Sequence, residues 1–230
     1  MPSVKLLTAA TAATLALAPT AAAQAPAGGA AFVPNALSVS AGALAGETIT
    51  VRGELPRAAG ERVRVERFDA ETGAWKAVAW DEADADGRFA ARWKALAVGR
   101  HTIRAVPDRQ AASSARSTDP DAPTGSTTVY RRAGATWYGP GFWGRSTACG
   151  DTLEPELMGV AHKTLPCGTK VTLFYQGRAV TVTVIDRGPY ADGVAWDLTK
   201  AASDELGMTE AGRVTLGALP EAPPAAGRQR

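Results

Sequence analysis

Asp186 is the residue whose type and position most clearly suggest chemistry. It ends an apolar strand pattern at residues 179–185 and directly precedes Arg187, Gly188 and Pro189. A carboxylate at the point where a strand leaves a sheet lies at a rim, where a groove can form and a proton can be transferred. A structural role is the alternative, because Asp186 could pair with Arg187 or cap a turn at Gly188.

Three further titratable side chains occur in the same part of the chain. His162 lies at the edge of a short apolar segment, where its ring could tune a carboxylate or bind a hydroxyl group. Asp151 follows a glycine, and a surface-turn acid is its simplest alternative role. Asp197 and Thr199 both precede a predicted helix, and either could cap it. If Thr199 is the cap, Asp197 is free to face a groove.

Aromatic residues gather in the segments between these acids. Exposed aromatic faces can stack on apolar rings, whereas buried ones pack in a core. Trp143 and Tyr190 are flanked by glycine or proline, which favours exposure, and Tyr138 lies close to Trp143 in sequence. Core packing is expected for Trp137.

Alternation and turn signals predict the elements that position these residues. Residues 170–175 and 179–185 form a hairpin joined by a short glycine-containing turn. Residues 200–206 form a short helix that ends at a glycine, and residues 213–216 form a closing strand.

The preceding part of the chain predicts an antiparallel β-sandwich of immunoglobulin type over residues 36–131. Short alternating stretches such as 48–53 and 63–68 are separated by turn signals. Residues 107–125 contain few apolar side chains and predict a long loop or linker. Residues 126–131 have strand composition and are assigned to the last strand of the sandwich, although they could instead lead into the next domain.

Residues 1–23 have the pattern of an export signal. Lys5 precedes an apolar run, and small residues at 21–23 supply a cleavage site. A retained membrane helix is the alternative, but the run is shorter than the roughly 20 residues that a span needs. No cysteine follows the run to carry a lipid, so we expect no stable membrane anchor and a secreted protein, extracellular or in the cell wall. Residues 24–35 and the tail at 219–230 are expected to be disordered.

Charge and cysteine content exclude several classes of function. The net charge is +2 without a block of like charges, which does not indicate nucleic-acid binding. Cys149 and Cys167 are the two cysteines, and an even pair in an exported protein predicts one disulfide. Two cysteines and two distant histidines do not give a zinc-ligand spacing, so no metal and no cofactor are predicted. The sequence does not indicate the oligomeric state.

The C-terminal segment resembles the rare lipoprotein A (RlpA-like) family of double-psi β-barrels. The resemblance covers residues 133–218 and none of the first domain, and it implies a six-stranded barrel with a short helix. Several motifs occur in the order and near the spacing of the family. They are ATWYG at 135–139, GRSTA at 144–148, VAHKTLP at 160–166, GTKV at 168–171, IDRGPY at 185–190 and DLT at 197–199.

The resemblance implies roles for individual residues. Asp186 matches the catalytic acid of the family, which includes lytic transglycosylases of peptidoglycan, with His162 and Asp151 beside it in the catalytic group. Such an enzyme needs no water nucleophile, because the 6-hydroxyl of the sugar closes the ring. One acid–base group can therefore suffice, unlike the paired carboxylates of ordinary glycosidases. The residues expected to bind substrate are Tyr138, Trp143, Arg187, Tyr190 and Asp197.

Two departures from the family stand out. Asp151 replaces the usual Glu and is shorter by one methylene group. Cys149 and Cys167 replace residues that are usually Asn and an aromatic, and the two changes occur together, as a disulfide requires. The bridge would close an 18-residue step around His162, a constraint worth about 3 kcal/mol.

We therefore expect a secreted protein that binds peptidoglycan glycan strands and cleaves them to 1,6-anhydro ends, as an endolytic lytic transglycosylase does. The alternative is a non-catalytic, expansin-like module that binds and loosens the cell wall. An enzyme requires Asp186 half-buried and near His162, whereas a binding module requires a flat, open strip of aromatic residues.

Overall fold

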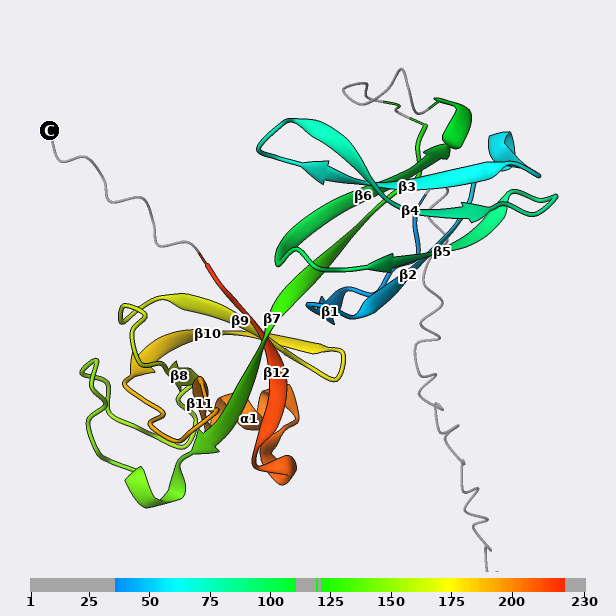
Figure 1. Cartoon of the computed structure of the whole chain (residues 1–230). Coiled ribbons are helices and arrows are strands. Elements are labelled where there is room, and N and C mark those ends of the chain that lie inside the picture. The colour runs from blue at the N-terminus through cyan, green and yellow to red at the C-terminus, as the bar shows by residue number, and fades with distance from the viewer. Residues whose placement is uncertain (1–35, 111–118, 120, 222–230) are drawn as a thin grey trace, which may run out of the picture. The chain divides into compact units, whose positions relative to one another are not determined.

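The computed structural model describes residues 36–110, 119 and 121–221 (Figure 1). Within these ranges the protein is all-β, with one α-helix and a few short 3₁₀ turns. The predicted signal peptide at 1–23, the segment 24–35 and residues 222–230 of the tail lie outside the described residues. The expected disorder from residue 219 is wrong for Leu219 and Pro220, which continue the last strand and pair with Thr172 and Val171. None of the described helices is long and apolar enough to cross a membrane.

The first seven strands form two sheets around one core. β2 and β5 pair antiparallel, while the other sheet has the order β4-β3-β6-β7, with β1 parallel to β7. Val51, Val65 and Trp93 are among the buried residues of the shared core. The neighbours of Val51 and Trp93 along β2 and β5 are more exposed, as the period of two requires, whereas Glu66, next to Val65, is buried where the register of β3 shifts. The strands are β1 (Gly42–Leu44), β2 (Thr48–Glu54), β3 (Arg62–Asp69), β4 (Ala74–Glu82), β5 (Arg88–Lys94), β6 (Gly99–Pro107) and β7 (Thr124–Tyr138).

β7 belongs to both halves of the fold. It pairs with β6 through Thr124–Val129 and with β12 through residues 131–135. The segment 126–131, assigned from sequence to the first domain, is therefore continuous with the first strand of the second. The sequence places residues 126–131 in the first domain and begins the second at residue 133, and one strand of 15 residues passes through both segments. The alternation of buried and exposed residues changes phase at that point, because Val129 and Tyr130 are both buried and Arg131 and Arg132 are both exposed.

Six strands close into a barrel. The order β7-β12-β9-β10-β8-β11 returns to β7, and the β10–β8 and β11–β7 pairs are parallel. The barrel surrounds its own core, which includes Val160, Leu173 and Leu198. The remaining strands are β8 (Gly159–Ala161), β9 (Lys170–Tyr175), β10 (Arg178–Asp186), β11 (Trp196–Thr199) and β12 (Val214–Pro220).

The single helix, α1 (Lys200–Leu206), follows β11 directly. The Thr199 hydroxyl accepts a hydrogen bond from the backbone N–H of Ala202, and Gly207 ends the helix at φ 77°. Because Thr199 is the cap, Asp197 is free for another role. The 3₁₀ turns are Pro56–Ala58, Asp108–Gln110, Pro140–Phe142 and Thr209–Ala211.

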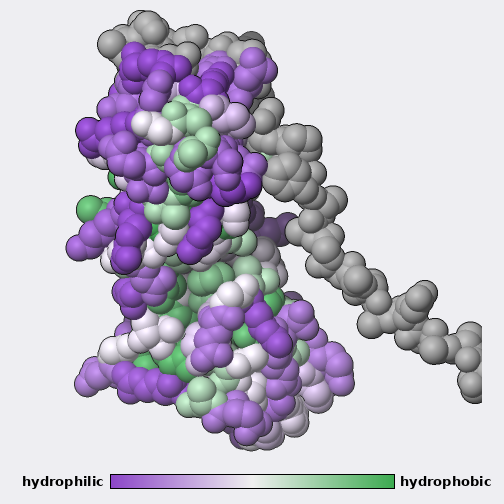
Figure 2. Space-filling model, turned by 90° about the vertical axis from the view of Figure 1, so that its right-hand side faces the viewer, coloured by the Kyte–Doolittle hydropathy of each residue, from purple (hydrophilic) through white to green (hydrophobic). Residues whose placement is uncertain are grey.

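The surface is largely hydrophilic on the face drawn in Figure 2, and apolar residues reach it in separate patches. The exposed aromatic residues include Trp80, Phe142 and Tyr190. Phe142 and Tyr190 belong to the cavity described below.

Candidate functional site

A cavity of about 470 Å³ opens where β7, β10 and β11 meet the loops that follow them. Four residues in register form a row across its floor. Asp186 on β10 pairs with Ala161 on β8, Ala161 pairs with Asp197 on β11, and Asp197 pairs with Thr136 on β7. The lining residues are Thr136, Tyr138, Phe142, Arg145, Ser146, Thr147, Leu153, Ala161, Asp186, Arg187, Gly188, Pro189, Tyr190, Ala191 and Asp197.

In this register one strand, β8, lies between the two aspartates. Adjacent strands lie about 4.8 Å from each other, so the Cα atoms of Asp186 and Asp197 are about 10 Å apart across β8. Side chains of residues paired in this way project from the same face of the sheet. Two carboxyl groups from different strands therefore face one cavity.

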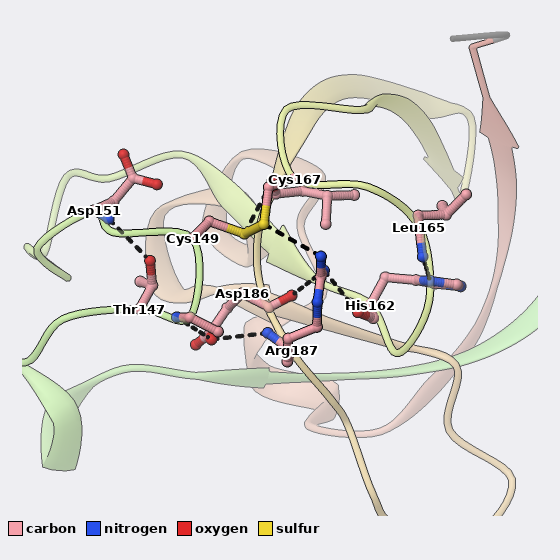
Figure 3. The surroundings of a disulfide bond; sticks show 10 residues. Thr147, Cys149, Asp151, His162, Leu165, Cys167, Asp186 and Arg187 are labelled. Carbon is pink, nitrogen blue, oxygen red and sulfur yellow. Dashed lines mark hydrogen bonds between the residues drawn. A yellow bond between two sulfur atoms is a disulfide. The ribbon is translucent and has the colours of Figure 1, made fainter.

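Asp186 is half-buried and held by the backbone. Its Oδ1 accepts hydrogen bonds from the backbone N–H groups of Ala148 and Arg187, both at 2.8 Å (Figure 3). Donors of this kind fit an ionised carboxylate, which only accepts. The backbone thus fixes the orientation of the carboxyl group at the rim.

Asp197 is held differently. Its Oδ1 accepts a hydrogen bond of 2.7 Å from the Thr136 hydroxyl. Burial raises the pKa of Asp197, the Thr136 hydrogen bond opposes that shift, and the negative charge of Asp186 raises the pKa further. Asp197 is therefore the carboxyl of this cavity that holds its proton to higher pH than an ordinary aspartate.

Tyr138 completes this group of side chains. It follows Thr136 by two positions on β7, so both project from the same face of the strand. Its hydroxyl oxygen is buried and makes no hydrogen bond of ordinary geometry within the described residues. Burial and the charges of Asp186 and Asp197 raise the pKa of Tyr138, so the side chain stays neutral.

The structure does not bring His162 into the cavity. Its Nδ1 accepts hydrogen bonds from the backbone N–H groups of Thr164 and Leu165, and its ring lies 4.3 Å from that of Trp196. Figure 3 shows the ring pointing away from Asp186. Burial, followed by the charges of Arg187 and Lys163, lowers the pKa of His162, which keeps Nδ1 an acceptor. The ring therefore orders its own loop.

Comparison with known proteins agrees with this geometry. Residues 125–217 match the lytic transglycolase family. The endolytic peptidoglycan transglycosylase RlpA of Campylobacter jejuni is 45% identical over 80 residues, which are 34% of this chain and 29% of that protein. The C-terminal domain is an RlpA-like double-psi β-barrel.

Two further similarities are to a second relative and to a solved structure. A probable endolytic peptidoglycan transglycosylase RlpA of Aquifex aeolicus is 45% identical over 85 residues, which are 36% of this chain and 38% of that protein. The chain thus spans less than two fifths of the length of these two relatives. An expansin structure of Clavibacter michiganensis is 25% identical, with a TM-score of 0.34 over 41% of this chain and 52% of that one.

Asp151 lies at the outer edge of the RlpA-like barrel and does not line the cavity. Its backbone N–H donates to the Thr147 hydroxyl, and its carbonyl oxygen accepts from the Thr147 N–H. The carboxylate is exposed and points away from Asp186 in Figure 3. Its charge still contributes to the raised pKa of Tyr138, so it acts on the site electrostatically.

The predicted substrate-binding residues divide into two groups. Arg187 and Tyr190 line the cavity, and Tyr190 is 81% exposed. Trp143 does not line it and instead packs against Gly139, where a Cβ would meet the indole at 2.5 Å. Phe142, which directly precedes Trp143, is the exposed aromatic residue, because the 3₁₀ turn at Pro140–Phe142 directs its side chain outward.

Arg145 and Thr136 also belong to the site, although sequence reasoning did not select them. Arg145 lines the cavity from the loop before Thr147, with its guanidinium 5.7 Å from the Phe142 ring. Both residues lie within motifs shared with the RlpA-like family. These motifs were recognised in the sequence, but the residue types alone do not indicate that the two side chains face the cavity. The three-dimensional arrangement of the strands and loops is needed to show it.

The predicted disulfide between Cys149 and Cys167 is confirmed, with Cα atoms 5.8 Å apart. It adjoins the site through Ala148, whose N–H holds Asp186, and through Arg187, whose Nη2 lies 3.2 Å from the Cys167 sulfur. The bridge therefore ties the loop that orients Asp186 to the loop that carries His162 (Figure 3).

Removing this disulfide should lower stability substantially. We expect the Cys149→Ser, Cys167→Ser double variant to lose about 3 kcal/mol of unfolding free energy, because an 18-residue loop is no longer closed in the unfolded chain. Denaturant titrations at fixed pH measure the loss. Reductant should destabilise the wild type and leave the double variant unchanged; equal stability of the two oxidised proteins would contradict the prediction.

In the part of the chain that the structure describes, no group of three or more His, Cys, Asp or Glu side chains could hold a metal ion. The cavity instead offers two carboxyl groups, two phenols and two guanidinium groups, and the Tyr138 phenol stays neutral. This set can exchange protons and bind a polar, hydroxyl-rich ligand.

Proposed function

We propose that the barrel cleaves peptidoglycan glycan strands as an endolytic lytic transglycosylase and leaves 1,6-anhydro ends. The observation that carries the proposal is the row Asp186–Ala161–Asp197–Thr136, which presents two differently held carboxyl groups to one cavity. The printed names of the relatives support the same activity.

The reaction requires two proton transfers, one to the leaving oxygen and one from the attacking 6-hydroxyl. The bond between the anomeric carbon of a muramic-acid sugar and its leaving oxygen breaks, and a carboxyl group protonates that oxygen. The 6-hydroxyl of the same sugar attacks the anomeric carbon and gives its proton to a carboxylate. No water is consumed, so a carboxyl group and a carboxylate satisfy the balance.

The two aspartates divide this work in our proposal. Asp197 donates the proton to the leaving oxygen, since burial helps it to remain protonated. Asp186 accepts the proton of the 6-hydroxyl, since the N–H groups of Ala148 and Arg187 favour its charged form. The family resemblance assigns both tasks to Asp186, and we propose Asp197 for one of them.

Substrate contacts are proposed for the cavity mouth. The exposed rings of Phe142 and Tyr190 offer faces for sugar rings, and Arg145 and Arg187 offer donors for hydroxyl or carboxylate oxygens. An extended strand could then lie across the mouth with one glycosidic bond above the two aspartates.

Digestion of purified cell-wall sacculi tests the activity. The protein is incubated with sacculi that carry or lack stem peptides, and the soluble products are analysed for 1,6-anhydro ends by mass spectrometry. New anhydro ends support the proposal. Binding without new ends, under conditions in which an established transglycosylase is active, would instead support an expansin-like binding module.

The pH dependence of cleavage should reveal Asp197. Its proton is lost as the pH rises through its raised pKa, so activity should fall along that alkaline limb. The Thr136 hydrogen bond lowers the pKa of Asp197, and Thr136→Val removes it. The pKa should then rise further, and we expect the alkaline limb to move to higher pH.

Thr172→Val is the matched control for that experiment. It removes a hydroxyl that pairs with Thr181 at 3.0 Å between β9 and β10, away from the cavity. Rates of anhydro-end release across the pH range measure both variants. An alkaline limb that stays in place, or moves to lower pH, in Thr136→Val would remove Asp197 as the proton donor.

Two further proposals concern the first domain and the location of the protein. We infer that residues 36–131 are an immunoglobulin-like sandwich, which the two sheets around one core support. We also infer export after signal-peptide cleavage, with the mature protein extracellular or in the cell wall. The pair of bonded cysteines supports an oxidising compartment.

A further inference from the structure

The Tyr138 hydroxyl is a polar group that the proposed reaction does not yet use. Its oxygen is buried and unpaired within the described residues, although its ring has ordinary contacts, such as the Phe142 ring at 6.2 Å. A buried hydroxyl without a partner lowers stability, and native structures contain few of them. Such a group in the wall of a cavity indicates a partner that appears only in another state of the site.

The charges around Tyr138 restrict what that partner can be. Asp186 on β10 and Asp197 on β11 line the same cavity as Tyr138, and the negative charges of these two residues and of Asp151, in the loop after β7, disfavour ionisation of the phenol. Arg145 and Arg187 line the same cavity, and Lys200 of α1 lies 5.8 Å from the adjacent Trp137 ring. The surrounding carboxylates keep the phenol protonated, so Tyr138 can only act as a neutral donor toward them.

Asp186 is the better acceptor of the two. The Oδ1 atom of Asp197 already accepts a hydrogen bond of 2.7 Å from Thr136, whereas Asp186 is the carboxylate that raises the pKa of Tyr138 by hydrogen bonding as well as by charge. No hydrogen bond of ordinary geometry joins the Tyr138 hydroxyl to Asp186 in this structure. Hydrogen bonds of active sites are often long before substrate binds and shorten in the complex.

We propose that Tyr138 donates a hydrogen bond to Asp186 when a glycan strand fills the cavity, and thereby keeps the proton of the site on Asp197. The inference rests on the proposed transglycosylase function. A donor to a carboxylate favours its charged form, so the base stays ionised while the acid stays protonated. Tyr138 is a positioning residue in this scheme, because it acts through the two aspartates.

Tyr138→Phe separates this role from a structural one. The change removes only the unpaired hydroxyl and keeps the ring against Phe142, so thermal stability should stay equal or rise. We expect kcat for anhydro-end release to fall about tenfold or more, in line with a hydrogen bond to a charged group. The acid limb of the pH profile should move to higher pH, and KM should change little.

Tyr175→Phe is the matched control. It removes a phenol of the same barrel whose oxygen accepts a hydrogen bond from Gln176 at 3.1 Å, outside the cavity. This variant should keep the wild-type kcat and both limbs of the profile. If Tyr138→Phe behaves like Tyr175→Phe, the inference is overturned while the proposed function stands.

A second readout does not depend on cleavage. Carboxyl ¹³C signals of labelled aspartate report the titration of Asp186 and Asp197 as a coupled pair. With a glycan fragment bound, the two titration steps should be separated by a smaller pH interval in Tyr138→Phe than in the wild type. If the wild type releases no anhydro ends, the proposed function is wrong, and the titration experiment still tests the inference on its own. Titration steps that lie equally far apart in Tyr138→Phe and in the wild type would overturn the inference, and steps that move together in Tyr138→Phe would support it.

Discussion

Asp186→Asn should abolish the release of 1,6-anhydro ends while leaving the fold and binding to sacculi nearly intact. Asn keeps the shape of the side chain, and its oxygen can still accept the N–H groups of Ala148 and Arg187 at the Oδ1 position. It cannot accept a proton from the attacking 6-hydroxyl. Since acid–base catalysis is worth about 10²–10⁴-fold, the fall in rate should be plain in product counts by mass spectrometry.

Asp192→Asn is a matched control for that variant. Asp192 is exposed in the loop between β10 and β11, and it does not line the cavity. Its substitution removes one carboxylate from the same surface and should leave the rate within about twofold, because surface charges contribute little to such sites. An Asp186→Asn protein that melts normally and keeps its activity would contradict the proposed base.

The hairpin and the helix of the barrel could be predicted from the sequence because their signals are local. Alternation at 170–175 and 179–185 and the glycine in the turn define β9 and β10. A capping threonine and a glycine at Gly207 define α1. Closure of the six strands depends on parallel pairing between distant segments, which no local pattern encodes, so that part came from the family resemblance.

The end of the first domain was harder to place. The sequence places the boundary between residues 131 and 133, where the family resemblance begins, and hydrogen bonding carries β7 across that point to Tyr138. The alternation changes phase where β7 exchanges β6 for β12, with Val129 and Tyr130 both buried and Arg131 and Arg132 both exposed. Composition alone predicts the strand, but it does not show which strands lie beside it on either side of that point.

The candidate site was predicted in its residue types and less well in its geometry. Asp186, Asp197 and Tyr138 share the cavity, whereas His162 turns toward Trp196 and Asp151 stays at the outer edge. A motif shows that a residue lies near a site, but its backbone hydrogen bonds decide where the side chain points. For His162, two backbone N–H groups of its own loop donate to Nδ1 and so orient the ring away from the cavity.

Asp197→Asn should cost as much as Asp186→Asn if Asp197 is the proton donor. The amide oxygen of Asn can still accept from Thr136, so the row across β11 and β7 should persist. The leaving oxygen, however, would depart without a proton, and we expect a loss of about 10²–10⁴-fold on sacculi. If Asp186 performs both tasks alone, Asp197→Asn should lose less than about tenfold, as expected for one lost hydrogen bond.

A substrate with an activated leaving group distinguishes the two aspartates. A muramic-acid glycoside of 2,4-dinitrophenol releases a stable anion that needs no proton, whereas attack by the 6-hydroxyl still needs a base. The loss in Asp197→Asn should therefore shrink strongly on this glycoside, and the loss in Asp186→Asn should remain. Release of the dinitrophenolate, followed by its absorbance, measures both rates. Equal losses of both variants on the activated glycoside would show that Asp197 is not the donor, because only the proton-donating step is bypassed by that leaving group.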